Sequence, residues 1–408
     1  MNILILGAGY DQLQMLRKAK AMGLRVFVAD RDAMAPGMNE ADVSLKIDTS
    51  DEEAIVQAIG DNHIQGVCTM ATNLAPRVVA SVCQRFSFSS ISPEAAHSAT
   101  DKSLMRRLCH KAGVPIADGG DAQCLNDAIG LVNSLGYPVL FKPADASGCR
   151  GIEVVHCAND IECAYHAAAR EATSGVVVVE RYYQDALVFG AESLIHNGQT
   201  TLVMVADKVV RFKPRISTAG VTIPSVLTKL EISKLQSYLE AIHQVIGLEM
   251  GPTHINFIHD GTAMRVIDIG PRLAGGPMIH ELAPRLTNID MIECVLRQAV
   301  GKPIDPMPSK ITAVGLERHL YAPLSGVIKD VQVPSSLRTN MTMQWRKPSG
   351  SLLKTDGTNV DRLGYLTAIA ASRQDAAQRI AYVVDKIELT IQDQEGRTRK
   401  VKPVLYID

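Results

Sequence analysis

The first 92 residues alternate between short apolar runs and helix-like segments, and this alternation constrains the fold more than any other feature. The run NILIL at 2–6 is followed by a glycine turn and a helical segment, and similar runs return at 25–30 and 66–70. Short apolar runs of this kind are typical of parallel strands buried on both faces. The rhythm predicts a doubly wound parallel α/β domain over residues 1–92.

The turn after the first strand, GAGYDQ, matches a dinucleotide-binding turn only in part. Such a turn needs three glycines, for the turn itself, for approach of the pyrophosphate and for packing of helix on strand. Gly7 and Gly9 supply two, but Gln12 stands at the third position. Asp30 lies where a ribose-binding acid is expected and is the one feature that favours NAD. An NAD oxidoreductase is therefore the most distant hypothesis.

The composition excludes several classes of protein. A chain of 408 residues is too long for one ordinary core. Its formal net charge of −1 gives no reason to expect a nucleic acid partner. No apolar stretch approaches the ~20 residues of a membrane span, so we expect no membrane association. Eight cysteines without a CxxC pair favour reduced thiols, and hence a cytoplasmic protein, over a disulfide framework or a zinc site.

A second glycine-bearing loop, KPADASGCRG, lies between two predicted strands at 137–143 and 151–156. Its small residues let backbone N–H groups turn inward and cradle phosphate oxygens. Lys142, at the start of this segment, adds a positive charge for the same phosphates. Lys102, in SATDKSLMRRL, would supply a second charge from another element. An ordinary loop with two solvated lysines explains each piece alone, but the segments that follow favour a phosphate site.

The strand VVVVERYY, at residues 176–183, is the next of these segments. A strand leaving a domain can offer its backbone to the edge of an adenine. We expect Glu180 to meet the exocyclic amine, and the backbones of Arg181 and Tyr183 to make the edge contacts.

The segment FGAESLIHNGQTTLVMVADKVV predicts an antiparallel hairpin with Asn197-Gly198 as its turn. The last segment, HINFIHDGTAMRVIDIGPRLAGG, predicts two strands around the turn Asp260-Gly261. Asn256 and Asp268 fall on these adjacent strands, and oxygen ligands facing each other across a hairpin suit Mg²⁺. Arg272 follows four residues later, where it can meet a phosphoryl group. We also name three substrate-contact candidates, His254, Arg285 and Arg215, the last from a cationic stripe on a strand.

Four segments follow one another along the chain in the order DKSLMRRL, YPVLFKPADASGCRG, VVVVERYY and VIDIGPRLAGG. With these segments in this order, the sequence resembles the ATP-grasp carboxylate–amine ligases over most of its length. GPTHINF and the tail RLGYLTAIAASRQDAAQRIAYVVDKIEL look most like the dipeptide-forming L-amino-acid ligase branch. The resemblance implies an N-terminal α/β domain at 1–92 and an ATP-grasp domain with a central antiparallel sheet at 93–305. It also implies a mobile lid at about 113–182 and a C-terminal α+β subdomain at 306–408.

The same resemblance implies that the chain activates a small-molecule carboxylate with ATP as an acyl phosphate, which an amine then attacks. Mg²⁺, with Mn²⁺ as a substitute, would be the metal cofactor, and a homodimer would fit the family. Arg272 would be the catalytic residue, and Asn256 and Asp268 would hold the metal. The residues implied at the ATP site are Lys102, Lys142, Ser147, Gly148, Gly151, Glu180, Arg181, Tyr183 and Glu192.

The chain departs from the family at the metal site. Family members usually have Glu at the position of Asn256, Glu at that of Asp268 and Asn at that of Gly270. A site with fewer carboxylates weakens Mg²⁺ binding yet suits a more anionic substrate. Two alternatives therefore stand beside the ligase: a carboxylase-type enzyme that activates bicarbonate, and a catalytically degraded nucleotide-binding protein with a regulatory role.

Overall fold

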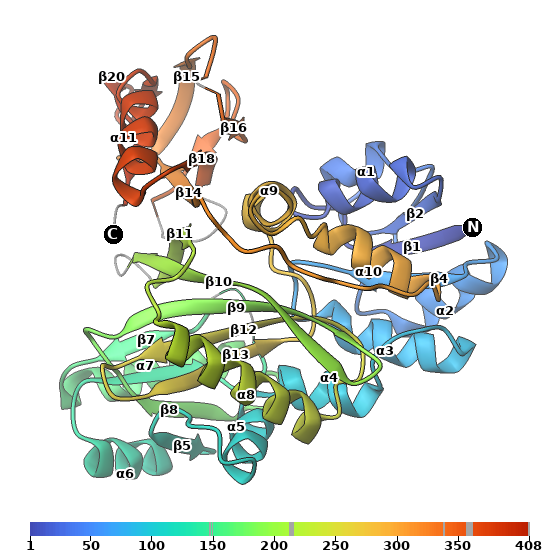
Figure 1. Cartoon of the computed structure of the whole chain (residues 1–408). Coiled ribbons are helices and arrows are strands. Elements are labelled where there is room, and N and C mark those ends of the chain that lie inside the picture. The colour runs from blue at the N-terminus through green and yellow to red at the C-terminus, as the bar shows by residue number, and fades with distance from the viewer. Residues whose placement is uncertain (147, 149, 212–215, 338, 356–361, 407–408) are drawn as a thin grey trace. The chain divides into compact units, whose positions relative to one another are not determined.

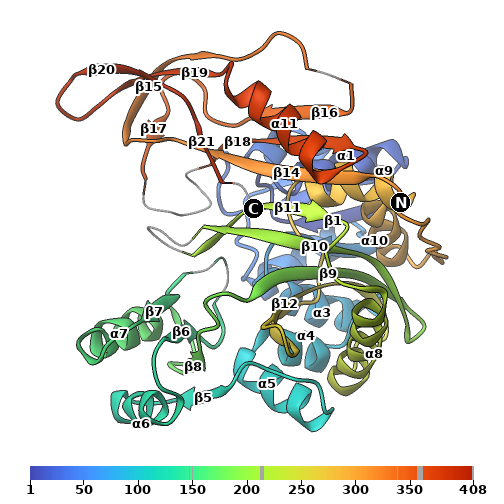
Figure 2. The same ribbon diagram turned by 60° about the vertical axis from the view of Figure 1, so that its left-hand side comes forward.

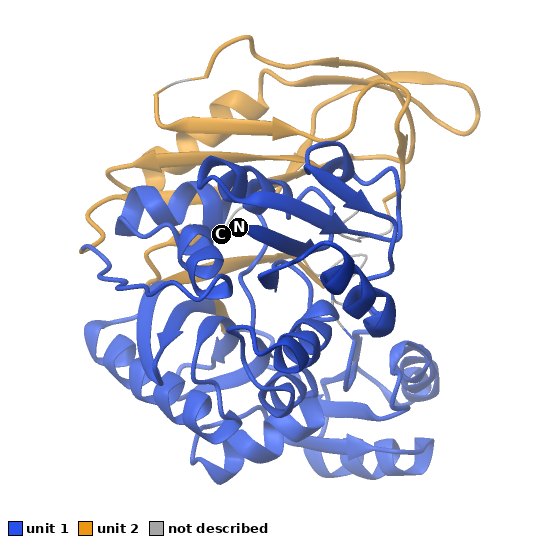
Figure 3. Cartoon of the chain, turned by 90° about the vertical axis from the view of Figure 1, so that its right-hand side faces the viewer, with its two compact units in different colours: residues 1–186, 190–204, 227–309 blue, residues 187–189, 205–226, 310–408 orange. Residues whose placement is uncertain are grey.

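A computed structural model describes residues 1–146, 148, 150–211, 216–337, 339–355 and 362–406. The chain divides into two compact units (Figure 3). The first comprises residues 1–186, 190–204 and 227–309, and the second comprises residues 187–189, 205–226 and 310–408. No helix in the described part of the chain is long and apolar enough to cross a membrane.

The first unit begins with the predicted parallel domain, a four-stranded sheet in the order β3-β2-β1-β4 with all pairings parallel (Figure 1). Its core joins Leu4 and Phe27 from the strands to Ile55 and Val82 from the helices. The short strand β3 was not predicted. The elements are β1 Asn2–Leu6, α1 Leu13–Ala21, β2 Arg25–Ala29, β3 Val43–Leu45, α2 Glu52–Asp61, β4 Gly66–Thr69 and α3 Ala75–Phe86.

A second four-stranded sheet, in the order β5-β8-β6-β7, is antiparallel throughout and lies within the predicted lid segment (Figure 2). Alternate residues of its strands, Phe141 and Val179 among them, pack with helices α6 and α7 in one core. Because side chains alternate across a strand, Lys142 and Glu180 point to the opposite face. The elements are β5 Gly119–Ala122, α6 Leu125–Leu135, β6 Val139–Pro143, β7 Glu153–Val155, α7 Ile161–Glu171 and β8 Val177–Arg181.

The central sheet of the first unit follows the order β13-β12-β9-β10. Two hairpins form it, and their turns are those expected from the sequence, Asn197-Gly198 and Asp260-Gly261. Asn197 and Gly198 both have positive φ, as a tight hairpin turn requires. The elements here are α4 Pro93–Thr100, α5 Lys102–Lys111, β9 Leu187–His196, β10 Gln199–Arg211, α8 Lys229–Ile246, β12 Gly251–His259, β13 Met264–Gly270, α9 Ala283–Thr287 and α10 Met291–Ala299.

The second unit takes the end of β10 and continues through an antiparallel sheet in the order β10-β11-β14-β18-β16. A smaller antiparallel sheet, β17-β15-β19-β20, accompanies it. Leu316, Leu366 and Ile380 represent the core that joins the strands to helix α11. The elements are β11 Ser217–Ile223, β14 Val314–Tyr321, β15 Gly326–Gln332, β16 Met341–Trp345, β17 Leu352–Leu353, β18 Arg362–Ala370, α11 Arg373–Val384, β19 Glu388–Gln392, β20 Thr398–Val401 and β21 Val404–Leu405.

Candidate active site

Lys142 and Glu180 form a buried ion pair on the face of the sheet β5-β8-β6-β7 opposite to the one that packs with α6 and α7. The Nζ atom of Lys142 lies 2.7 Å from Oε2 of Glu180 and donates a 3.1 Å hydrogen bond to the carbonyl of Ile267. Lys142 is 4% exposed and Glu180 is 3% exposed. Burial lowers the pKa of Lys142, while the carboxylate of Glu180 opposes that effect. A cation held among buried groups interacts strongly with any anion that reaches it.

Helix α5 brings two more cations to the same region. Asp101 caps this helix by accepting a hydrogen bond from the N–H of Leu104, which fixes Lys102 as its first residue. Four residues later on the same face, Arg106 forms an ion pair with Glu180. Arg106 was not predicted from the sequence, although its spacing from Lys102 in DKSLMRRL is the signal that places it there.

Lys102 connects the glycine-bearing loop to the predicted metal ligands. Its Nζ atom donates a 2.7 Å hydrogen bond to the carbonyl of Ala146 and lies 3.5 Å from Oδ1 of Asp268. Asp268 stands directly opposite Asn256 in the register of β12 and β13. The two predicted metal-ligand positions are therefore adjacent, and Lys102, one of the lysines predicted to bind phosphate, lies beside them.

The surroundings keep Asp268 charged. Burial alone would raise the pKa of its carboxyl, but the positive charges of Lys102, Arg272 and Lys142 outweigh burial and lower it. Asp268 is thus a carboxylate at neutral pH, as a cation ligand must be. Among the described residues, no group of three histidine, cysteine, aspartate or glutamate side chains is placed to hold a metal. Asp268 with Asn256 therefore fits a cation that takes its remaining ligands from phosphate oxygens and water, as Mg²⁺ commonly does.

Arg272 occupies space that a side chain at position 270 would need. A Cβ atom built on Gly270 would lie 2.7 Å from Cζ of Arg272 and 2.9 Å from its Nη1. Burial lowers the pKa of Arg272, and the charges of Asp268 and Glu192 oppose that effect. Its Nε and Nη1 atoms are buried and have no hydrogen-bond partner among the described residues. Unpaired buried donors of a cation are costly, so these atoms suit an anionic ligand.

Glu192 and His254 lie on neighbouring strands β9 and β12 and are hydrogen-bonded through Oε1 and Nδ1. Glu192 is completely buried, and its Oε2 atom has no hydrogen-bond partner within the described chain. Because Glu192 also affects the pKa of Arg272, both predicted residues belong to the same cluster as the lysines and Asp268.

The glycine-bearing loop has the backbone that its composition indicates. Gly148 and Gly151 both have positive φ, near 70°, which side chains disfavour. A Cβ atom on Gly148 would meet nothing within 4 Å. Ser147, the third residue predicted in this loop, lies outside the described residues.

Arg181 and Tyr183 lie at the end of β8 beside Asp118. The N–H of Arg181 donates to the carbonyl of Asp118 at 2.7 Å, and the Tyr183 hydroxyl donates to Oδ2 of Asp118 at 3.0 Å. Their adenine contacts stay a prediction. Of the other substrate candidates, Arg285 is an exposed residue of α9, and its contact with a substrate stays a prediction. Arg215 lies outside the described residues.

The N-terminal glycine turn is closed by groups of its own domain. Asp30 accepts a 2.8 Å hydrogen bond from the N–H of Ala8, and the N–H of Gly37 donates to the Ala8 carbonyl at 2.7 Å. The side chain of Gln12 lies against the turn and donates to the carbonyl of Met70 at 2.7 Å. The acid that favoured NAD is thus a structural ligand of the turn.

The loop after Arg272 reaches this N-terminal domain. The N–H of Ala71 donates to the carbonyl of Leu273 at 3.0 Å, and a Cβ atom on Gly275 would lie 3.1 Å from the carboxyl carbon of Asp11. The end of β4 and the residues after the glycine turn therefore border the loop that carries Arg272.

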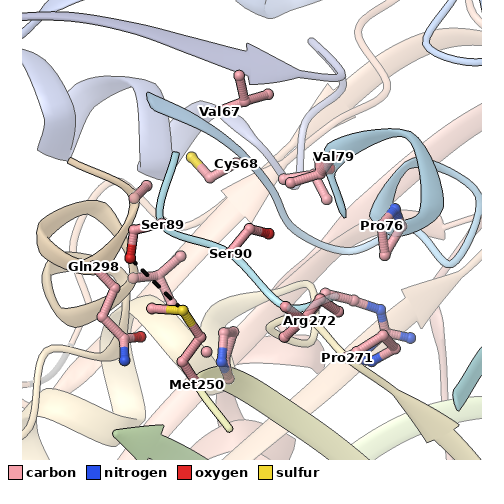
Figure 4. A pocket seen from close by; sticks show the side chains of 16 residues that line it. Val67, Cys68, Pro76, Val79, Ser89, Ser90, Met250, Pro271, Arg272 and Gln298 are labelled. Carbon is pink, nitrogen blue, oxygen red and sulfur yellow. Dashed lines mark hydrogen bonds between the residues drawn. The ribbon is translucent and has the colours of Figure 1, made fainter. Parts of the chain in front are cut away.

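A cavity of about 60 Å³ lies between Arg272 and Gln298 (Figure 4). Ser90 and Met250 also line it, and most of its other neighbours are apolar. The Nε2 atom of Gln298 donates to the carbonyl of Ile195 at 2.7 Å. A space of this size holds a few water molecules, so we assign no substrate to it.

Comparison with known proteins identifies the family. The family model described as the carbamoyl-phosphate synthase L chain, ATP binding domain, matches residues 101–307, just over half of the chain. The uncharacterized protein y4rH of Sinorhizobium fredii is 23% identical over 363 residues, which are 85% of this chain and 73% of that protein. The carbamoyl phosphate synthase large chain of Streptomyces coelicolor is 29% identical over 183 residues, but these are only 16% of that protein and 44% of this chain.

Three solved structures share the fold. Phosphoribosylglycinamide synthetase from Anaerococcus prevotii has a TM-score of 0.78 at 18% identity, covering 96% of this chain and 99% of that one. L-amino acid ligase from Bacillus licheniformis has a TM-score of 0.79 at 15% identity, with the same coverage of both chains. Biotin carboxylase from Campylobacter jejuni, solved as a β,γ-ATP complex, has a TM-score of 0.77 at 21% identity and covers 99% and 92%. By fold and by its matched ATP binding domain, the chain belongs to the ATP-grasp family of ligases and carboxylases.

Proposed function

We propose that this protein is an ATP-dependent ligase that activates a carboxylate as an acyl phosphate and joins it to an amine. The observation that carries the proposal is the partly buried cluster of Lys102, Lys142, Asp268 and Arg272, with Glu192 beside it. With Arg106 and Glu180 included, four cations stand against the three carboxylates of Asp268, Glu180 and Glu192. The net positive charge suits a polyphosphate with a bound cation.

The chain's own residues act by positioning and by charge. Lys102 and Lys142 would bind phosphate oxygens from two different elements, and the N–H groups around Gly148 and Gly151 would close over them. Arg272 would stabilise the charge on the transferring phosphoryl group through the donors that have no partner among the described residues. Glu180 holds Lys142 in place from the neighbouring strand.

Mg²⁺ would be held by Asp268 and by the side-chain oxygen of Asn256. When bound, it neutralises charge on the phosphates. With a single carboxylate, the site would bind Mg²⁺ mainly as its complex with ATP, and Mn²⁺ would take the same ligands.

The sheet β5-β8-β6-β7, with its own core, would act as the lid. By closing over the nucleotide it would exclude water, which matters because an acyl phosphate is readily hydrolysed. We place the domain boundaries near residues 92 and 305, as the sequence indicates.

An amine as the acceptor of the activated acyl group is favoured by the C-terminal tail and by GPTHINF. Both segments look most like the amino-acid ligase branch. A carboxylase that activates bicarbonate is the second candidate, because the fold is equally that of biotin carboxylase. The seven cysteines that the structure describes are free, which supports a cytoplasmic location. A homodimer is consistent with the solved dimer of a biotin carboxylase domain from Hydrogenobacter thermophilus.

The decisive experiment measures release of ADP and phosphate from ATP with Mg²⁺, using pooled amino acids, small carboxylates and bicarbonate in separate reactions. Stimulation by a carboxylate together with an amine supports the ligase. Stimulation by bicarbonate alone supports the carboxylase. Nucleotide binding without turnover in any pool supports the degraded, regulatory protein.

A further inference from the structure

Glu192 is a completely buried acid of the first unit, and one of its two carboxylate oxygens is left unbonded. It lies on β9, the strand beside β12 in the central sheet (Figure 1). Its Oε1 atom is hydrogen-bonded to Nδ1 of His254, whereas Oε2 is buried and has no hydrogen-bond partner among the described residues. A buried charged oxygen without a donor is costly. Glu192 therefore calls for a donor that the described part of the chain does not supply.

The contacts of Glu192 place it on the face of the central sheet that carries the proposed metal ligands. Ser193, the next residue, is bonded to Thr253 at 2.6 Å, and Glu192 is bonded to His254. Side chains alternate across a strand, so Glu192 and His254 share one face of the sheet with Asn256. Ser193 and Thr253 point to the other face.

The hairpin of β12 and β13 orders this face from a nucleoside end to a phosphoryl end. Near the hairpin turn, the guanidinium of Arg265 lies 5.3 Å from the centre of the ring of Tyr183, the residue expected at the adenine. Asn256 and Asp268 oppose each other further along the two strands, and His254 lies two residues beyond Asn256, away from the turn. His254 and the carboxylate bonded to it therefore lie past the metal position, at the end far from the expected adenine.

Arg272 brings unbonded donors to this same end. Its Nε and Nη1 atoms are buried without a partner among the described residues. The charge of Glu192 opposes the lowering of the pKa of Arg272 by burial, so the two side chains interact electrostatically. Oε2 of Glu192 is nevertheless bonded to neither of these donors. Opposite charges separated in this way suit a ligand that accepts from the arginine and donates to the carboxylate.

An amine that attacks an acyl phosphate offers both kinds of group. The acyl phosphate has acceptor oxygens for Arg272, and the amine has an N–H for Glu192. A fully ionised carboxylate or phosphate alone does not fit, because it has no donor and the charge of Glu192 would repel it. A ribose hydroxyl could donate, but the ribose is attached to the adenine and belongs at the other end of the hairpin.

We propose that Oε2 of Glu192 accepts a hydrogen bond from the amine that attacks the acyl phosphate, so that Glu192 is the amine-binding residue of this site. The inference rests on the proposed function and deepens it, because it assigns a residue to the second substrate. In the reaction step, the C–N bond forms as the C–O bond to phosphate breaks, and the proton that the neutral amine loses leaves with the phosphate. His254 holds the carboxylate in this orientation through Oε1.

The test measures hydroxamate formation by the full chain, with hydroxylamine as the amine probe. ATP and Mg²⁺ are present, and small carboxylates and L-amino acids are supplied as separate pools. Glu192→Gln keeps the size of the side chain but removes its charge. Glu192→Asp keeps the charge but withdraws the carboxylate from the site. Glu240→Gln is the matched control, because it makes the same replacement at an exposed position of α8.

We expect the KM for hydroxylamine to rise by about tenfold to a hundredfold in Glu192→Gln, the usual effect of losing a hydrogen bond to a charged group. Glu192→Asp should raise the same KM, and it decides the matter if the glutamine variant does not fold. The KM for ATP should stay unchanged in both variants, and the control should match the wild type. A merely structural role of Glu192 would instead disturb the use of ATP and of hydroxylamine alike.

The proposal is overturned, with the proposed function intact, if the wild type forms hydroxamate and both Glu192 variants keep its KM for hydroxylamine. A parallel rise in the KM for ATP or for Mg²⁺ overturns it too, since Glu192 would then belong to the nucleotide or its metal. If no pool yields hydroxamate with the wild type, the ligase is refuted and this assignment with it. ADP release stimulated by bicarbonate in that case would point to the carboxylase.

Discussion

Two glycine-bearing turns follow strands in the first unit, and they have opposite relations to their surroundings. The N-terminal turn is filled by its own domain. Asp30 and Gly37 form hydrogen bonds with the backbone of Ala8, and the side chain of Gln12 lies against Gly7. In the loop after β6, a Cβ on Gly148 would meet open space, and two lysines face the same region. Glycine spacing alone therefore does not identify a phosphate site. A turn can accept a phosphate only where the protein's own side chains leave the space beside its backbone open.

The largest expected effect comes from Lys142→Met. The remaining Arg106 and Glu180 still form a balanced pair, so the fold survives while a phosphate contact is lost. ADP release should fall by about a hundredfold or more, as for removal of one transition-state donor. Lys111→Met, at the exposed end of α5, is the matched control. Turnover equal to that of the control would show that Lys142 and the loop after β6 do not bind phosphate and have only a structural role, like the N-terminal turn.

Asn256→Glu tests whether the reduced metal site is a working one. The new carboxylate would stand opposite Asp268 and should lower the Mg²⁺ concentration needed for nucleotide binding by several-fold. It would also add negative charge where an anionic substrate approaches, so we expect slower ADP release at saturating Mg²⁺. Titration of Mg²⁺ at fixed ATP measures both effects. A gain of turnover from an inactive wild type would favour the degraded protein.

Gly7→Ala should lower the stability of the protein, because Gly7 lies in the closed N-terminal turn. Its φ of +100° is strained for alanine, and the new Cβ would lie 3.3 Å from the side chain of Gln12. We expect the free energy of unfolding to drop by about 1–2 kcal/mol. Urea denaturation provides the measurement. A stability equal to the wild type would mean that the turn is not held as tightly as its contacts indicate.

Gly148→Ala should instead affect binding, because nothing surrounds the new methyl group. The φ of +70° still strains alanine, so we expect a loss of stability of about 1 kcal/mol, which is smaller than at Gly7, where contact with Gln12 adds to the strain. ATP affinity should decline a few-fold, since N–H groups turned inward by the positive φ would be redirected. If Gly148→Ala destabilises the protein more than Gly7→Ala does, the contrast between the two turns fails.

The smallest effect is expected for NADH. Because both carboxylate oxygens of Asp30 already accept backbone N–H groups, from Ala8 and Asp32, we expect the protein to leave NADH fluorescence unchanged. A saturable change in that fluorescence would revive the oxidoreductase hypothesis and reopen the N-terminal turn as a ligand site.

The sequence predicted the parallel domain, both hairpin turns and the meeting of Asn256 with Asp268, because these depend on local periodicity and turn chemistry. It did not predict Arg106 as a partner of Glu180, since the two are 74 residues apart and only the fold brings them together.

Gly270 has a consequence for how this site tolerates change. Taken alone, a glycine in place of a ligand suggests erosion, but here the guanidinium of Arg272 fills the space of the missing side chain. Residues 270 and 272 are therefore coupled, and a substitution at one alters what is permitted at the other. Asparagine at position 270 fits only if the side chain of Arg272 takes another orientation. We therefore expect Gly270→Asn alone to reduce activity more than Gly270→Asn combined with a second substitution that makes room for Arg272.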